Sequence, residues 1–181
     1  LGGVALPWGS VRLQQGGEVP TLSGFDEGGW WVQDAAAALP ALLLGDIKDK
    51  TVVDLCAAPG GKTAQLASAG AHVIAVDRSE SRLKRLSENM RRAWLPGEVV
   101  TSDALHWQPD KAVAAVLIDA PCSGTGTLRR HPDIARIKSQ ADVEKLSTLQ
   151  QKLLTHAATF VKPGGLIVYA TCSLQPEEGP D

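Results

Sequence analysis

Long apolar runs, paired cysteines and an excess of charge are all missing from this chain of 181 residues. No apolar run approaches the roughly 20 residues that a membrane helix needs. The N-terminal LGGVALPWGS has neither the basic start nor the long apolar stretch of a signal peptide. The formal net charge of -2 argues against a protein that binds nucleic acid through its overall charge. The composition, 44% hydrophobic, excludes disordered and collagen-like chains and suits one globular domain, alone or with a small appendage.

Cysteines are few, and their spacing excludes two kinds of protein. Cys56, Cys122 and Cys172 lie far apart and form no C-x-x-C pair, which disfavours a disulfide scaffold and a zinc site. We therefore expect reduced thiols, a cytoplasmic protein and no metal. Each cysteine stands in a stretch rich in Gly, Pro, Ser or Thr directly after an apolar run, a placement that structural cysteines rarely need.

The chain divides into an irregular start and a regular remainder. Residues 1–34 are rich in Gly and Trp and predict short strands, and Asp34 predicts the cap of a helix over 35–44. We expect residues 1–45 to lead into a main domain over 46–181. In that domain the pattern predicts strands at 51–55, 72–76, 99–101, 112–118 and 166–170, and helices at 62–69, 79–93 and 141–161.

Strands that alternate with helices predict an α/β fold with a Rossmann-like, doubly wound and mostly parallel sheet. Ligands of such sheets bind beyond the carboxyl ends of the strands. Those ends carry polar or reactive residues in all five strands: Asp54, Asp77, Asp103, Asp119 with Cys122, and Cys172. The sequence therefore predicts a site on this edge.

The loop 54–62, with sequence DLCAAPGGK, joins the first strand to the first helix. Its glycines allow a ligand to approach the backbone, and the helix behind them offers free N–H groups. It matches neither G-x-G-x-x-G nor the complete P-loop pattern, so a pyrophosphate ligand is disfavoured. Asp77 is placed to bind ribose hydroxyls, and Asp103 to bind an adenine amino group.

Ribose and adenine without a phosphate cradle indicate S-adenosylmethionine as the cofactor. The alternative is that Gly60 and Gly61 only form a turn and Asp77 only caps a helix. The expected cofactor contacts are Cys56, Ala57, Ala58, Pro59, Gly60, Gly61, Lys62, Asp77, Asp103 and Asp119.

Cys122 and Cys172 follow two strands that are neighbours in the usual order of such sheets, so both thiols should face one cleft. The alternative is that they are two small buried residues.

Several segments together resemble one enzyme family. They are Val32-Gln33-Asp34, residues 54–63, Asp77 with Arg82-Leu83, DAPCSGTG at 119–126, Arg130-His-Pro-Asp133, and YATCS at 169–173 with Pro176-Glu-Glu178. They resemble the catalytic domain of the Sun/Fmu family of RNA (cytosine-C5) methyltransferases, of the bacterial small-subunit ribosomal RNA type. The resemblance spans about residues 30–178. It implies a class I S-adenosylmethionine-dependent methyltransferase fold that ends here after its fifth strand.

The resemblance also implies catalytic roles. Cys172 would add to carbon 6 of cytosine, which turns carbon 5 into a nucleophile toward the methyl group. Asp119 would share a proton with N3 of the ring. Cys122 would act in release of the product. DNA enzymes take the nucleophile from a Pro-Cys motif, so an exchange of the two cysteines is the main alternative. A nucleophilic Cys172 should have a depressed pKa.

Arg130, His131, Pro132 and Asp133 follow the Gly-rich loop and predict contacts with substrate phosphates. The alternative is a solvated basic turn. Where the family usually continues with Lys and Trp, Ala135 and Arg136 stand here.

The sequence thus predicts an S-adenosylmethionine-dependent RNA cytosine-C5 methyltransferase, with ribosomal RNA as its expected partner and no membrane association. The alternatives are a methyltransferase of this fold that acts on DNA or another substrate, and a cofactor-binding RNA-binding module without catalysis. The sequence does not indicate an oligomeric state.

Overall fold

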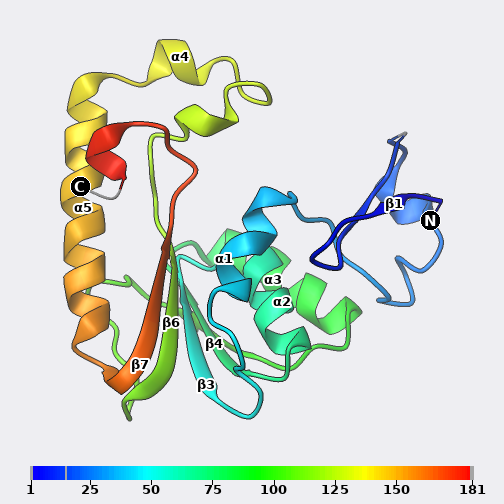
Figure 1. Ribbon diagram of the computed structural model, residues 1–181, viewed down its shortest axis with the longest axis horizontal. Helices are drawn as coiled ribbons and strands as arrows, with labels where there is room; N and C mark the ends of the chain where they lie inside the picture. The colour runs from blue at the N-terminus through cyan, green and yellow to red at the C-terminus, as the bar shows by residue number, and fades with distance from the viewer. Residues whose placement is uncertain (1, 15, 180–181) are drawn as a thin grey trace.

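A five-stranded parallel sheet forms the centre of the protein in a computed structural model, which describes residues 2–14 and 16–179 (Figure 1). The strands are β3 (Thr51–Leu55), β4 (His72–Asp77), β5 (Glu98–Thr101), β6 (Val113–Asp119) and β7 (Val161–Ala170). Their order is β5-β4-β3-β6-β7, and every neighbouring pair is parallel. This is the 3-2-1-4-5 order of a Rossmann-like sheet, so the predicted fold class is confirmed.

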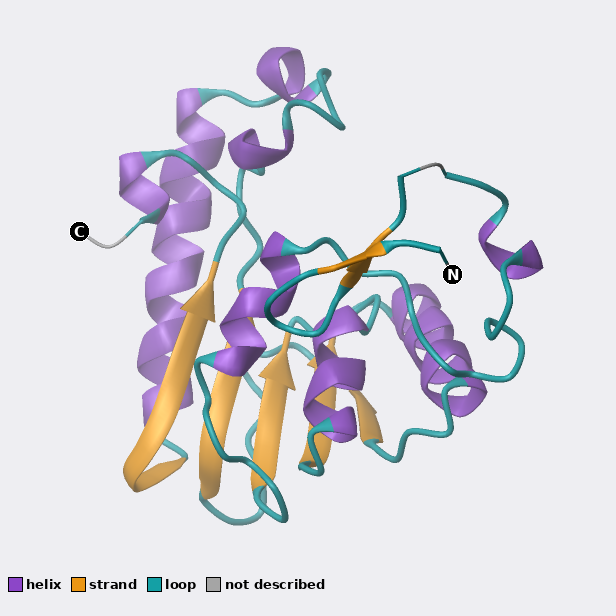
Figure 2. Cartoon of the chain, turned by 45° about the vertical axis from the view of Figure 1, so that its right-hand side comes forward, coloured by secondary structure: helices purple, strands orange, loops and turns teal. Residues whose placement is uncertain are grey.

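Helices cover both faces of the sheet (Figures 1 and 2). On one side lie α1 (Leu39–Leu42), α2 (Gly61–Ser68) and α3 (Glu80–Arg92), and on the other lies the long α5 (Gln140–Ala158). The short α4 (Ile134–Ile137) lies in the loop that leads to α5. The remaining elements are the antiparallel pair β1 (Val4–Ala5) and β2 (Val11–Arg12) and the 3-10 turns η1 (Val19–Thr21), η2 (Ala36–Ala38), η3 (Thr125–Thr127) and η4 (Pro176–Glu178).

The alternation of side chains along β3 explains why the successive residues Val52 and Val53 are both apolar. Val52 packs into the core cluster that contains Leu66 of α2 and Leu86 of α3, whereas Val53 packs into the cluster that contains Leu153 of α5. All of these side chains are fully or almost fully buried, and each such aliphatic residue contributes on the order of 2 kcal/mol of burial energy. A strand that is covered on both faces therefore carries apolar residues on both of its faces.

The chain between α5 and β7 differs from the predicted arrangement. The helix expected over 141–161 ends at Ala158, and the strand begins at Val161, where the β6–β7 pairing starts. Residues 163–165, which lie between the predicted helix and the predicted strand, are inside β7, where the register shifts between Val161 and Leu166. A Cβ on Gly165 would lie 2.6 Å from the carbonyl oxygen of Ala114, so this irregularity needs glycine.

The buried side of α5 includes one polar residue. Val143, Leu153 and Ala157 are buried, whereas Leu154 is 42% exposed and the polar Gln150 is buried. Gln150 is buried because its amide donates hydrogen bonds to groups of the candidate site described below.

The N-terminal segment is fastened to the end of α3 by Arg92. Its guanidinium donates to the carbonyl oxygens of Phe25 at 2.5 Å and Trp30 at 3.1 Å, and lies 3.8 Å from the centre of the Phe25 ring. Gly28, with a φ of 73°, lies so close that a Cβ there would be 2.0 Å from the Arg92 carbonyl oxygen. These contacts hold the segment before Gln33 against the C-terminal end of α3.

Candidate active site

The carboxyl ends of the parallel strands lead into loops that gather on one edge of the sheet, as the arrowheads in Figure 2 show. A cavity of about 480 Å³ opens there. It is lined by residues from the N-terminal segment, the loop after β3 and the end of β6, among them Phe25, Trp31, Gln33, Asp34, Ala57, Pro59, Gly60, Gly61, Lys62, Asp119 and Arg130. Five of the expected loop residues and Asp119 therefore border one space.

The loop after β3 has a backbone shape that depends on Gly60. This residue has a φ of 102°, and a Cβ there would lie 2.6 Å from Cγ of the buried Leu86. The N–H of Ala58 donates to Oδ2 of Asp77 at 3.1 Å, and Arg82 both donates to the Ala58 carbonyl oxygen and pairs with Asp77 at 3.7 Å. Asp77 at the end of β4 thus holds this loop in place.

Asp77 also accepts a hydrogen bond from the N–H of Ser79 at 2.9 Å through Oδ1. Its contact at the start of α3 is therefore present, but it is one of several contacts that Asp77 makes. Cys56, in the same loop, carries an ordinary neutral thiol. Burial, followed by the nearby charge of Asp77, raises its pKa to about 12. This favours packing rather than reaction at Cys56.

Asp54, at the end of β3, is a site residue whose environment the sequence did not indicate. Its carboxyl group is fully buried, accepts from the Thr63 hydroxyl at 2.6 Å through Oδ2, and has no partner at Oδ1 within the described residues. Burial raises the pKa of Asp54 to about 7 against the opposing effect of the Thr63 hydrogen bond. The bond with Thr63 joins β3 to the first turn of α2.

An ion pair joins the loop after β3 to the end of β6. Nζ of Lys62 lies 2.7 Å from Oδ2 of Asp119, and the Lys62 side chain is 11% exposed while that of Asp119 is 41% exposed. β3 and β6 are the two strands between which the order of the sheet reverses, the usual ligand position in this fold. Asp103 lies further out: its side chain is half exposed and accepts from the N–H of Leu105 at 2.9 Å.

The two cysteine loops meet as predicted. β6 and β7 are neighbours, and Sγ of Cys122 lies 3.3 Å from Sγ of Cys172, both as free thiols. The hydrogen bond from Cys172 lowers the pKa of Cys122 to about 6 despite its burial, with further help from Thr171 and the N–H groups of Cys172 and Gly124.

The expected depression of the Cys172 pKa is wrong for this resting arrangement. The contact with Cys122 and burial raise the pKa of Cys172, because Cys172 is the thiol that donates. The two sulfurs therefore share one proton, and the pair titrates as a unit.

This shared proton makes a prediction for the pH dependence of alkylation. Iodoacetamide should modify the pair with an apparent pKa near 6, and in a Cys172→Ala variant the pKa of Cys122 should rise toward the ordinary thiol value of 9.0, since its main stabilising donor is lost. Rates of modification at each cysteine, measured by peptide mass spectrometry between pH 5 and pH 10, would test this. A Cys122 that keeps a pKa near 6 in the variant would contradict it.

The expected substrate loop is only partly brought to the cavity. Arg130 lines it and forms an ion pair with Asp34 at 3.4 Å. His131, Pro132 and Asp133 are exposed and precede α4, where the Asp133 carbonyl oxygen accepts from Arg136 and Ile137. Their predicted contacts with RNA stay predictions.

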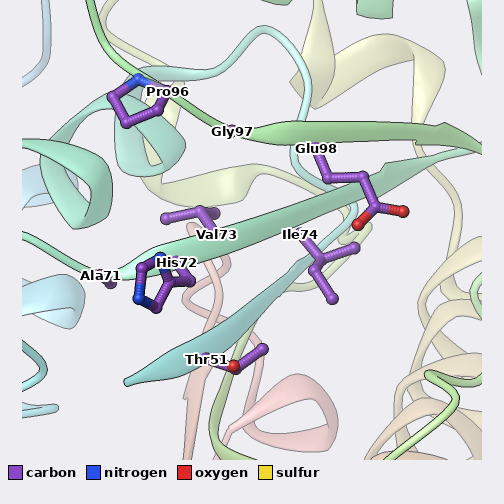
Figure 3. Close-up of a pocket in the computed structure, with 8 residues that line it drawn as sticks. All are labelled: Thr51, Ala71, His72, Val73, Ile74, Pro96, Gly97 and Glu98. Atoms are coloured by element: carbon purple, nitrogen blue, oxygen red, sulfur yellow. The ribbon is translucent and has the colours of Figure 1, made fainter. Parts of the chain in front are cut away.

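A second hollow, of about 410 Å³, lies at the opposite edge of the sheet (Figure 3). It is lined by the first residues of three strands and by the turn before β5: Thr51, Ala71, His72, Val73, Ile74, Pro96, Gly97 and Glu98. It lies at the amino ends of the strands, away from the usual ligand position, and we assign it no function.

Over residues 2–14 and 16–179, no cluster of three His, Cys, Asp or Glu side chains could hold a metal ion. Nor does the described part of the chain contain a helix long and apolar enough to cross a membrane.

Comparison with protein families gives a match over most of the chain. Residues 41–180 match the family described as 16S rRNA methyltransferase RsmB/F. Among curated proteins, the ribosomal RNA small subunit methyltransferase B of Erwinia tasmaniensis is 42% identical over 174 residues, and that of Serratia proteamaculans is 44% identical over 174 residues. Each alignment covers 93% of this chain and 41% of the relative, so the chain spans less than half of their length.

Solved structures with similar folds also match most of the chain. The protein PH0851 superposes with a TM-score of 0.86 at 35% identity over 91% of this chain and 39% of that one. A methyltransferase homolog protein from Pyrococcus horikoshii gives 0.84 at 30% identity, over 97% of this chain and 58% of that one. NSun6 from Pyrococcus horikoshii, determined with SFG, gives 0.81 at 28% identity, over 90% and 43%.

Proposed function

Because this chain belongs to the 16S rRNA methyltransferase RsmB/F family, we propose that it is the catalytic core of an enzyme that methylates carbon 5 of a cytosine in RNA. The methyl donor is S-adenosylmethionine and the substrate class is ribosomal RNA. The observation that carries the proposal is the position of two thiols, 3.3 Å apart, in the loops that follow β6 and β7, while the Lys62–Asp119 ion pair joins the end of β6 to the start of α2. Methyl donor and target base would thus meet at one edge of the sheet.

The residues present fit this cofactor. Gly60 and Gly61 border the cavity with their backbone, and the loop offers no pyrophosphate cradle. Asp77 accepts two intramolecular hydrogen bonds and forms an ion pair with Arg82, and a carboxylate accepts about four hydrogen bonds, which leaves capacity for a ribose hydroxyl. The exposed Asp103 would hold the adenine amino group. When bound, the cofactor supplies an electrophilic sulfonium methyl group.

Covalent catalysis begins at the thiol pair. The shared proton passes to Cys122 and leaves Cys172 as the thiolate, whose electron pair forms a bond to carbon 6 of the cytosine. The electrons of the carbon 5–carbon 6 double bond move through the ring to N3, which takes a proton that Asp119 has drawn from solvent. N3 returns this proton to Asp119 once carbon 5 has bonded to the methyl group. Lys62 holds Asp119 in its place beside the ring during this step.

Product release uses the second thiol. Cys122, which is half-buried and retains contact with solvent, first releases to solvent the proton that it took from Cys172. After carbon 5 carries the methyl group, Cys122 accepts the carbon-5 proton, the electrons re-form the ring double bond, and the bond between carbon 6 and Cys172 Sγ breaks. In the adduct Cys172 no longer donates to Cys122, so the pKa of Cys122 rises from its lowered resting value, which favours uptake of the carbon-5 proton.

The test is transfer of tritiated methyl groups from S-adenosylmethionine to small-subunit ribosomal RNA, followed by nucleoside analysis. We expect the label in 5-methylcytidine, and no label with a Cys172→Ala variant. Label in another nucleoside, or in DNA but not RNA, would contradict the proposal. Binding of cofactor and RNA without any transfer would favour the module without catalysis.

A further inference from the structure

A buried carboxylate lies beneath the two catalytic loops and belongs to neither. Glu178, in η4, is 1% exposed. Its Oε1 accepts from the N–H of Ser123 at 2.8 Å and from Nε2 of Gln150 at 2.9 Å, and its Oε2 accepts from the Ser123 hydroxyl. The Ser123 hydroxyl lies 2.9 Å from the hydroxyl of Ser173. The two serines directly follow Cys122 and Cys172 in the sequence.

Burial of the Glu178 carboxylate costs solvation energy, which the surrounding hydrogen bonds must offset. A carboxylate taken out of water loses much solvation energy, and Glu178 has no Lys, Arg or His partner among the ion pairs of the described residues. Burial opposes its ionisation, but the hydrogen bonds from Ser123, Ser173 and Gln150 outweigh burial and hold the pKa of Glu178 below its ordinary value. An apolar residue would fill the space at less cost if packing were the only need.

Further bonds connect the same loops. The hydroxyl of Thr125 lies 3.3 Å from that of Ser173 and accepts from the N–H of Leu174 at 2.8 Å. The N–H of Gly126 donates to the carbonyl oxygen of Cys172 at 2.9 Å. Through Gln150, which also donates to the carbonyl oxygen of Pro121 at 2.8 Å, the network is anchored to α5. The two loops are thus fixed to each other and to a rigid helix.

We propose that Glu178 is a positioning residue that sets the separation of the Cys122 and Cys172 sulfurs by holding Ser123 and Ser173 together. It touches neither thiol and acts through the serines. The inference rests on the proposed function for its catalytic meaning, but thiol geometry can be measured without it. A merely structural Glu178 would contribute to folding without affecting how the thiols share a proton.

The experiment uses phenylarsine oxide, which binds two thiols only when they lie close together. We expect a Glu178→Ala variant to bind it about tenfold more weakly than the wild type, the effect of losing a hydrogen bond. Glu178→Gln, which keeps the shape and can still bond both serines, should give an intermediate value. The matched control is Glu177→Gln, because Glu177 is the exposed neighbour that bonds only Gln140 in the described contacts.

The second measurement is the pH dependence of alkylation. In Glu178→Ala, the apparent pKa of Cys122 should rise from about 6 toward 9.0, because the donor Cys172 is no longer held against it. Ser123→Ala removes a single hydroxyl and should shift the same pKa in the same direction, which covers the case in which Glu178→Ala does not fold. Turnover should fall with the KM for cofactor unchanged.

Unchanged arsenical affinity and unchanged thiol pKa in folded Glu178→Ala or Ser123→Ala would overturn the positioning role. Neither measurement requires methyl transfer. If the variants changed arsenical affinity and thiol pKa as expected but the wild type transferred no methyl group, the result would count against the proposed function and not against the positioning role.

Discussion

A Cys122→Ala variant mixed with substrate RNA and S-adenosylmethionine should accumulate a covalent protein–RNA complex that survives denaturation, whereas Cys172→Ala should form none. Cys172 supplies the sulfur that bonds to carbon 6, and Cys122 supplies the base that allows this bond to break. Removal of either should lower turnover on the order of 10⁴- to 10⁶-fold, as for other covalent nucleophiles and their partners. A denaturing gel with labelled RNA separates the two outcomes, because only a stalled release step leaves RNA attached.

Two comparisons make this experiment decisive. Omission of the cofactor should reduce the trapped complex, because without methyl transfer the addition at carbon 6 reverses. The reverse pattern, with a complex in Cys172→Ala and none in Cys122→Ala, would exchange the roles of the two cysteines. This is the alternative that the Pro-Cys nucleophile of DNA enzymes raises, and the lower pKa of Cys122 gives it a physical basis.

The sequence predicted the sheet well because strands covered on both faces are mostly apolar and stand out as short apolar runs. β3 has the predicted bounds, and β6 differs by one residue at each end. The meeting of Cys122 and Cys172 also followed from the sequence, since strand order in this fold determines which loops are neighbours. These features depend on local composition and on a general topology, and both can be inferred from a single chain.

Features that depend on contacts between distant residues could not be predicted in this way. The proton of the thiol pair belongs to Cys172 because of hydrogen bonds that reach Cys122 from the facing loop. Gln150 stands on the buried side of α5 because Glu178 and Pro121 lie beside it, and no periodicity reveals such a partner. The Lys62–Asp119 ion pair likewise could not be predicted, because it forms between residues that are 57 positions apart and meet only in the folded chain.

Asp119 is the proposed proton donor to N3, and its replacement should also lower turnover strongly. Asp119→Asn keeps the size of the side chain and can accept one hydrogen bond from Lys62, but it cannot take up or release a proton at neutral pH. We expect turnover to fall about 10²- to 10⁴-fold, the usual contribution of a positioned acid or base. The complex trapped by Cys122→Ala should also fail to form in the double variant, because addition at carbon 6 needs the proton at N3.

Measurement of cofactor affinity separates this role from the alternative in which Asp119 mainly holds the cofactor. Equilibrium dialysis with labelled S-adenosylmethionine should give a similar Kd for Asp119→Asn and wild type, so that the loss appears in kcat. Asp110→Asn makes the same chemical change at an exposed position outside the cavity and should leave both quantities unaltered. If Asp119→Asn turned over normally at saturating cofactor and failed only in binding, the carboxylate would serve the cofactor. The proton at N3 would then have to come from another group, for which the Lys62 ammonium, 2.7 Å from Asp119, is the nearest donor.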